Sequence, residues 1–228
     1  MGARGPEKGK FRGNLREFLG RRANDSATAP RYRVRPMIGS RRVEGYAIVS
    51  ADGMIADATG TMPDSIRNDA DQRFLQAELD RAAVVVHGRH SHEGGPRAAR
   101  RKRLILTRRI AALAPDPSHP STLLWNPAGA TLAEALTTLD VGAGTIAIIG
   151  GTEVFGFFLP LYDAFHLTRA ARARIPGGRP LFPAVDAKTS PEDILARAGL
   201  KAGERRDIDA AGGITLTTWK REALYPQA

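Results

Sequence analysis

The sequence predicts an α/β fold with a mainly parallel central sheet that an antiparallel C-terminal strand closes. Short apolar, β-branched runs alternate with helical patterns over residues 43–170, an order typical of parallel strands joined by right-handed crossovers. Ile214–Lys220 instead alternates apolar and polar residues, which predicts a strand antiparallel to its neighbour. At 228 residues the chain is long enough for one sizeable core and an appendage.

The positive charge of the chain is concentrated at its N-terminus. Residues 1–42 contain twelve Lys or Arg against three Asp or Glu, whereas residues 43–228 are almost neutral, and the whole chain carries +10. Because residues 1–42 are also rich in Gly and Pro, we expect a basic, mostly disordered extension ahead of a domain over residues 43–228. Binding of nucleic acid through this tail is one functional hypothesis, and a solvated extension is the alternative.

The composition is ordinary for a soluble globular protein, with 42% hydrophobic and 25% charged residues. Cysteine is absent from the sequence, which excludes disulfides and thiolate sites and fits a reducing compartment. No apolar run approaches the roughly 20 residues that span a bilayer. We therefore expect a cytoplasmic protein that contacts no membrane, and we predict no metal site.

The first half of the domain contains two predicted strands with a helix between them. Val43–Ser50 reads as a buried strand, and the Asp-Gly pair that follows at 52–53 is typical of a turn. Asp69–Arg81 repeats apolar residues every three to four positions, which predicts a helix. The valine-rich Ala82–His87 predicts the second strand, and Gly88 ends it.

The second half predicts further strands and a capped helix. The strands are expected at Leu104–Thr107, Thr122–Trp125, Ile146–Ile149 and Ala164–Thr168. Thr131 and Glu134 form a capping box that opens a helix through Leu139. The proline-rich residues 114–120 predict a linker, and residues 171–213 predict irregular structure apart from a short helix near 191–198.

A glycine pair follows the strand at Ile146–Ile149. Gly150 and Gly151 lack Cβ atoms, and Thr152 is a suitable N-cap for the helix that the next residues predict. Such a junction lets a pyrophosphate approach the backbone and the unpaired amides of a helix N-terminus. It predicts a site for an anionic cofactor, and a plain tight turn is the alternative.

A second candidate site lies in the basic run of residues 97–109. This run contains seven Lys or Arg and no acidic residue, and it surrounds the strand predicted at Leu104–Thr107. Arg108 follows the end of that strand, which is where α/β sheets place their ligands. We therefore predict that Arg108 binds a ligand, although a solvated charged face is the alternative.

Five segments carry a family resemblance: Ile48–Ala56, Val86–Ser91, Leu104–Arg108, Ile149–Phe155 and Leu181–Pro183. In this order and spacing the chain resembles the dihydrofolate-reductase-like superfamily. It is most similar to the branch that contains the C-terminal reductase domain of the bifunctional riboflavin-biosynthesis deaminase/reductase. The resemblance covers roughly residues 43–220. It implies a three-layer fold with NADPH lying across the strand ends, and a homodimer.

The resemblance implies that three strand ends hold NADPH. Their residues are Gly88, Arg89 and Ser91, then Thr107 and Arg108, then Gly150, Gly151, Thr152 and Glu153. In this scheme Arg89 approaches the adenosine 2′-phosphate, and Ser91 caps the following helix. Guanidinium groups suit a dianionic phosphate because they present paired donors in a fork.

The implied reaction is hydride transfer from NADPH to a C=O or C=N bond of a pyrimidine- or pterin-type substrate. It is most like 5-amino-6-(5-phosphoribosylamino)uracil reduction in riboflavin biosynthesis, and reduction of dihydrofolate or a dihydropterin is the alternative. Such a reaction needs a proton donor. Asp69 is our first candidate and Asp71 the second, although favourable charge at a helix N-terminus also explains both. Ser50 is the candidate on the substrate side.

Two departures from the family bear on the substrate. Folate reductases place a carboxylate four residues before a helix phenylalanine, but Ala70 stands four residues before Phe74 here. A tryptophan expected after the loop is replaced by the run Met62-Pro63-Asp64. A phosphorylated substrate needs a second cationic pocket, for which the candidates are Arg67, Arg172, Arg174 and Arg179.

Overall fold

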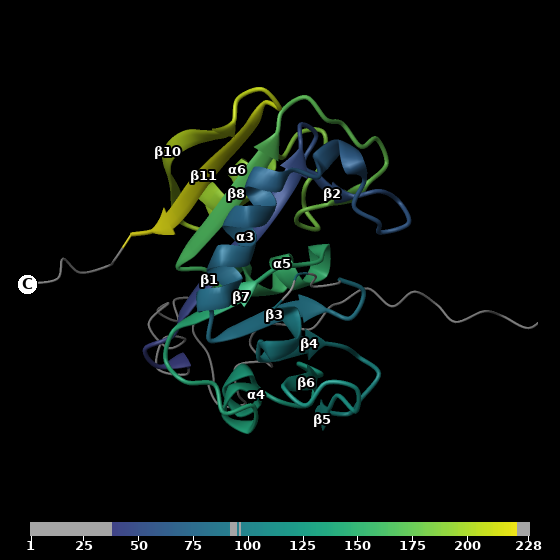
Figure 1. Ribbon diagram of the computed structural model, residues 1–228, viewed down its shortest axis with the longest axis vertical. Coiled ribbons are helices and arrows are strands. Elements are labelled where there is room, and N and C mark those ends of the chain that lie inside the picture. Colours follow the sequence, from purple (N-terminus) through teal and green to yellow (C-terminus); the bar gives the residue numbers. More distant parts are fainter. Residues whose placement is uncertain (1–37, 92–94, 96, 223–228) are drawn as a thin grey trace, which may run out of the picture.

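The described part of the chain forms a nine-stranded sheet in the order β10-β11-β8-β1-β7-β3-β4-β6-β5 (Figure 1). The computed structural model describes residues 38–91, 95 and 97–222. The strands of this sheet are β1 (Arg42–Ser50), β3 (Val84–Gly88), β4 (Arg103–Leu106), β5 (Leu113–Pro115), β6 (Thr122–Trp125), β7 (Thr145–Ile148), β8 (Ala164–Ala170), β10 (Leu200–Asp209) and β11 (Ile214–Arg221). Two further strands, β2 (Met54–Ala56) and β9 (Arg179–Pro180), pair separately.

The centre of the sheet is parallel, as the sequence predicts. Six successive strands pair with one another in parallel: β8, β1, β7, β3, β4 and β6. At the two ends of this set, β11 pairs antiparallel with β8 and β5 pairs antiparallel with β6. The register places Tyr46 opposite His166 and Ile48 opposite Thr168. The mainly parallel sheet with an antiparallel C-terminal strand is therefore confirmed.

Helices cover both faces of the sheet and make the fold three-layered. They are α3 (Asp69–Arg81), α4 (Leu132–Thr138), α5 (Thr152–Phe158) and α6 (Pro191–Arg197), with short 3-10 turns at Asp64–Ile66, Ala98–Arg100 and Leu159–Leu161. Figure 1 shows α3 lying across β1 and β8. Because strand side chains alternate, Val84 and Val86 join the core cluster with α4 and α5, whereas Val85 joins the cluster with α3.

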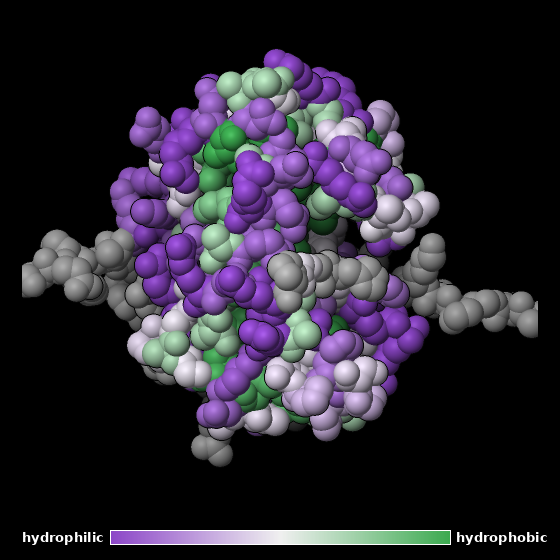
Figure 2. All heavy atoms as spheres, in the orientation of Figure 1, coloured by the Kyte–Doolittle hydropathy of each residue, from purple (hydrophilic) through white to green (hydrophobic). Residues whose placement is uncertain are grey.

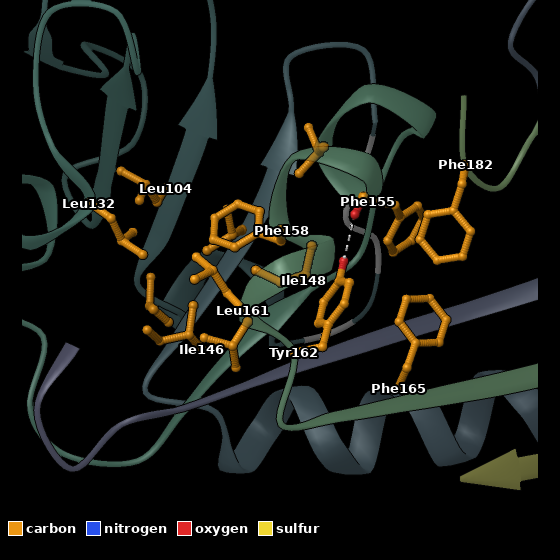
Figure 3. Packing of buried hydrophobic residues seen from close by; sticks show 14 of the residues in the cluster. Leu104, Leu132, Ile146, Ile148, Phe155, Phe158, Leu161, Tyr162, Phe165 and Phe182 are labelled. Carbon is orange, nitrogen blue, oxygen red and sulfur yellow. Dashed lines mark hydrogen bonds between the residues drawn. The ribbon is translucent and has the colours of Figure 1, made fainter. Parts of the chain in front are cut away.

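Aromatic rings fill the core between the sheet and α5 (Figure 3). Phe155 lies 5.7 Å from Phe165 and 6.4 Å from Phe182 between ring centroids. The buried Tyr162 satisfies its hydroxyl by donating to the Phe155 carbonyl at 3.3 Å. Each such side chain contributes about 1.5–3 kcal/mol when fully buried, so this core holds the adjoining glycine turn in place.

The surface seen in Figure 2 is mostly hydrophilic, with narrow hydrophobic bands. Met62, at 39% exposure, is the exposed large hydrophobic side chain among the described residues. No helix within the described ranges is both long and apolar enough to cross a membrane.

The structure differs from the sequence predictions at both edges of the sheet. β5 overlaps the start of the predicted linker at residues 114–120, and its Pro115 is tolerated because β5 is an edge strand. β10 lies in the stretch predicted to be irregular. The sequence does not predict this strand because its side chains are largely exposed and polar and give no apolar pattern.

Residues 38–42, at the end of the predicted basic extension, pack onto the domain, with Ile38 buried and Arg42 as the first residue of β1. The rest of the basic extension lies outside the described residues.

Candidate functional site

A cleft of about 1720 Å³ lies where the central parallel strands end. Gly88 at the end of β3, Thr107 after β4 and Gly151 after β7 line one part of it. Asp71 of α3 and Thr168 of β8 line another part. The carboxyl ends of three strands thus share one groove, which is the usual ligand site of an open α/β sheet.

Ten of the twelve predicted site residues line this cleft. They are Asp69, Asp71, Gly88, Arg89, Ser91, Thr107, Arg108, Gly151, Thr152 and Glu153. Gly150 and Ser50 are not among the lining residues. Ser50 is fully buried, and its hydroxyl donates to Asp52 at 2.5 Å and accepts from the Met54 amide at 3.0 Å. In this structure Ser50 therefore holds the turn after β1, and its substrate-side role stays a prediction.

The glycine pair forms the turn between β7 and α5. Gly150 has φ +119°, and a Cβ atom there would lie 3.0 Å from the Phe155 ring. The Gly150 carbonyl accepts from the Gly88 amide at 2.8 Å, which ties the ends of β7 and β3 together. A Cβ atom on Gly151 would lie 3.5 Å from the Ser91 hydroxyl. The positive φ and the Phe155 ring therefore favour glycine at position 150, whereas the contact at Gly151 is an ordinary van der Waals distance.

The prediction that Thr152 is the N-cap of α5 is wrong. Gly151 occupies that position, and no side chain caps the helix. The Thr152 hydroxyl instead donates to the Pro180 carbonyl at 2.5 Å, so it is used to fasten β9 to the start of α5. The helix that Ser91 is expected to cap lies outside the described residues.

Arginines gather at the cleft beside the ends of β3 and β4. Arg89, Arg108 and Arg109 all line it, and Arg108 and Arg109 are exposed to solvent. The Arg89 guanidinium lies 2.8 Å from the His90 ring nitrogen, and the Thr107 hydroxyl accepts from the Arg109 amide at 3.2 Å. We call Arg89, Arg108 and Arg109 the arginine edge. Guanidinium groups next to a glycine turn suit a phosphorylated nucleotide.

A buried carboxyl lies on the opposite side of the cleft, at the start of α3. Asp71 is only 9% exposed, and its side chain bonds to Thr168. Burial raises the pKa of Asp71, and the hydrogen bond with Thr168 opposes that rise. Asn68 fixes this turn because its Oδ1 accepts from the Ala70 and Asp71 amides at 2.9 and 3.2 Å. Asp69, the first candidate for the proton donor, also lines the cleft but is exposed. The buried acid is therefore Asp71, the second candidate.

Several cleft residues escape the sequence analysis. Tyr46 and His166 line the cleft and stack with their ring centroids 4.7 Å apart. His166 and Thr168 both face α3 because they are two residues apart on β8. Two polar residues two positions apart within the predicted strand Ala164–Thr168 are the signal that would have found His166 and Thr168.

The cationic candidates for a substrate phosphate separate in the structure. Arg67 and Arg179 line the cleft, whereas Arg172 and Arg174 do not. Arg179 donates to the Thr59 carbonyl at 3.0 Å, and Arg172 donates to a carbonyl of the β10–β11 turn. Within the described ranges no group of three or more His, Asp or Glu is arranged to hold a metal ion.

Searches by sequence find no relative: no family model and no curated protein matches the chain. Many solved structures resemble it, and three of them each match over 80% of this chain. A proposed riboflavin biosynthesis protein from Shewanella sp. PV-4 has a TM-score of 0.56 at 20% identity over 99% of its chain. Dihydrofolate reductase from Enterococcus faecalis, in complex with NADP(H) and RAB-propyl, has a TM-score of 0.54 at 18% sequence identity, and the match covers 97% of its chain.

The third structure is a diaminohydroxyphosphoribosylaminopyrimidine deaminase/5-amino-6-(5-phosphoribosylamino)uracil reductase from Thermotoga maritima. Its TM-score is 0.55 at 16% identity, and the match spans 57% of that longer chain. Identities this low bear on the fold alone. The protein has the dihydrofolate-reductase-like fold, related to that of the reductase domain in bifunctional deaminase/reductases.

Proposed function

We propose that this protein is an NADPH-dependent reductase that adds hydride to a C=O or C=N bond of a pyrimidine- or pterin-type substrate. One observation carries the proposal. A buried carboxyl with a raised pKa, Asp71, lines the same cleft as the glycine turn and the arginine edge. The likeness to an NADP(H)-bound dihydrofolate reductase supports it.

The residues present suit NADPH. Arg89 and Arg108 would pair with the 2′-phosphate, and the backbone at Gly88 and Gly151 leaves room for the pyrophosphate. When bound, NADPH supplies the hydride. The chain supplies alignment of the two reactants and complementary charge.

Asp71 would supply the proton. Hydride addition leaves an electron pair on the nitrogen or oxygen of the reduced bond, and that atom must be protonated. Because burial raises its pKa, Asp71 keeps its proton to a higher pH than an ordinary aspartic acid. After transfer the carboxylate remains bonded to Thr168, and water entering the cleft restores the proton.

Two substrate classes fit. The first is 5-amino-6-(5-phosphoribosylamino)uracil, for which Arg67 and Arg179 offer the second cationic pocket at the cleft. The likeness to the Thermotoga maritima deaminase/reductase supports this class. The alternative is dihydrofolate or a dihydropterin. The pairing of Asp71 with Thr168 favours that alternative, because an adjacent carboxyl and hydroxyl suit the N–C–N edge of a pterin.

Single-turnover assays separate these possibilities. The purified full-length chain is mixed with NADPH and each substrate in turn, and loss of reduced nicotinamide is followed by absorbance. We expect turnover with one class and a loss of at least a hundredfold in Asp71→Asn. Absence of turnover with both classes would contradict the proposal. Salt-sensitive nucleic-acid binding lost on deletion of residues 1–37 would support the tail hypothesis instead.

A further inference from the structure

A polar cluster under α3 takes no part in the chemistry above. Glu44 and Tyr46 come from β1, His166 from β8 and Thr218 from β11. One oxygen of Glu44 accepts from the Tyr46 hydroxyl at 2.9 Å and from the His166 Nε2 at 3.1 Å. The other ring nitrogen of His166 lies 3.1 Å from the Thr218 hydroxyl. Both nitrogens of the imidazole are therefore engaged.

The strand registers place this cluster directly beside the proposed acid site. Tyr46, His166 and Thr218 are cross-strand partners and form one row. The neighbouring row on the same face contains Thr168, about 6.8 Å away because residues alternate along a strand with a rise near 3.4 Å. The rigid row under α3 thus adjoins the partner of Asp71.

Helix α3 contacts both rows at once. Asp71 bonds to Thr168, and Phe74 lies 5.6 Å from the His166 ring and 6.3 Å from the Tyr46 ring. Asp71 and Phe74 are three residues apart, so they share one face of the helix. Their spacing along the helix axis is about 4.5 Å, at a rise near 1.5 Å per residue, so adjacent positions on this one face contact the two rows.

Hydrogen bonds hold the cluster together around the Glu44 carboxylate. The hydrogen bond from His166, followed by that from Tyr46, keeps the pKa of Glu44 low although burial opposes this. The exposed fractions of the His166 and Glu44 side chains are 14% and 11%. Removing His166 leaves the mostly buried Glu44 carboxylate with one hydrogen-bond donor fewer, which perturbs the side chains that pack on it.

We propose that His166 is a positioning residue. It fixes Phe74 through the ring contacts and so sets the place of Asp71 over Thr168, without touching the substrate's reacting bond. The proposal rests on the proposed function for its catalytic effect, but its structural part does not.

The test compares His166→Phe, which keeps a ring but loses both hydrogen bonds, with His166→Gln, whose amide can still donate to Glu44. Thr218→Val is a milder variant that removes only the contact to Nδ1. His119→Gln, at a half-exposed histidine paired with Asp116, is the matched control. Three quantities are measured at one pH in the full-length chain. They are kcat, the KM for NADPH, and the hydrogen-exchange rate of the amides in residues 69–76.

We expect His166→Phe to lower kcat about tenfold, since a displacement near 1 Å costs up to a hundredfold. The KM for NADPH should stay within twofold, and exchange in residues 69–76 should rise at least tenfold. In His166→Gln, kcat and the exchange rate should both return to within threefold of wild type. The values for Thr218→Val should lie between those of wild type and His166→Phe. Equal losses in the Phe and Gln variants, or unchanged exchange in His166→Phe, would overturn the proposal. Exchange needs no substrate, so a wild-type protein without turnover overturns the proposed function alone.

Discussion

Replacing Asp71 by Asn removes the proposed proton donor while keeping the size of the side chain. Asp71 is 9% exposed and bonds to Thr168, so the amide can occupy the same place. General acid catalysis contributes about 10²–10⁴-fold to a rate. We expect kcat to fall about 10²–10³-fold at pH 6, with the KM for NADPH unchanged.

The pH dependence provides a sharper criterion. The protonated carboxyl is the active form, and burial raises its pKa, so wild-type kcat should be constant at low pH and fall as pH rises through that raised pKa. The fall should be about tenfold per pH unit beyond it, because the protonated fraction falls tenfold per unit. Asp71→Asn should show a flat profile over the same range.

Stability should change in the opposite direction to activity. A carboxyl whose pKa is raised on folding destabilises the native state above that pKa, and this cost disappears below the ordinary value near 3.9. Asp71→Asn should therefore be more stable than wild type at pH 8, by about 0.5–2 kcal/mol, and lose this advantage in acid. Urea unfolding at the two pH values measures it.

The control is Asp69→Asn, which changes the exposed acid on the same turn. It should retain at least half of the wild-type kcat with an unchanged pH profile. A wild-type profile that rises with pH, or a loss in Asp69→Asn as large as in Asp71→Asn, would refute the assignment of the proton donor.

Other substitutions test the remaining parts of the cleft. Arg108→Ala should raise the Kd for NADPH about tenfold or more, as loss of a charged hydrogen bond does, and should change the Kd for NADH less than twofold. Equal effects on the two cofactors would count against a contact between Arg108 and the 2′-phosphate. Gly150→Ala should lower the free energy of unfolding, measured with urea, by about 1–3 kcal/mol because φ is +119° at this residue. Gly142→Ala should leave that free energy nearly unchanged, because no atom lies within 4 Å of a Cβ atom at Gly142. Arg179→Ala should raise the KM of a phosphorylated substrate at least fivefold and Arg172→Ala should not; a matching rise in both would argue against a second cationic pocket.

The sequence predicts the centre of the fold well because apolar pattern and helix capping act locally. The predicted bounds of α3, Asp69–Arg81, agree with the structure, and the capping box of Thr131 and Glu134 is present. The edges fail for a physical reason. β10 bonds on one side only and exposes most of its side chains, so its ten residues show no buried face.

That the ends of β3, β4 and β7 meet in one cleft is also predictable, since the residues at each strand end include a glycine or an arginine that the sequence analysis singled out. Gly88, Arg108 and Gly151 line the same cleft. The part of the cleft beside α3 is not predictable in this way, because it depends on which residue of a helix turn faces inward. Asp69 and Asp71 differ in sequence by two positions, but only the packing of α3 on Thr168 separates an exposed acid from a buried one.

Titration of the full-length protein with NADPH and with NADH tests the central claim most directly. If the arginine edge and the glycine turn bind a dinucleotide with an additional phosphate, the Kd for NADPH should be at least tenfold lower than that for NADH, a difference of about 1.4 kcal/mol or more. Equal affinity for the two, or no binding of either, would contradict it.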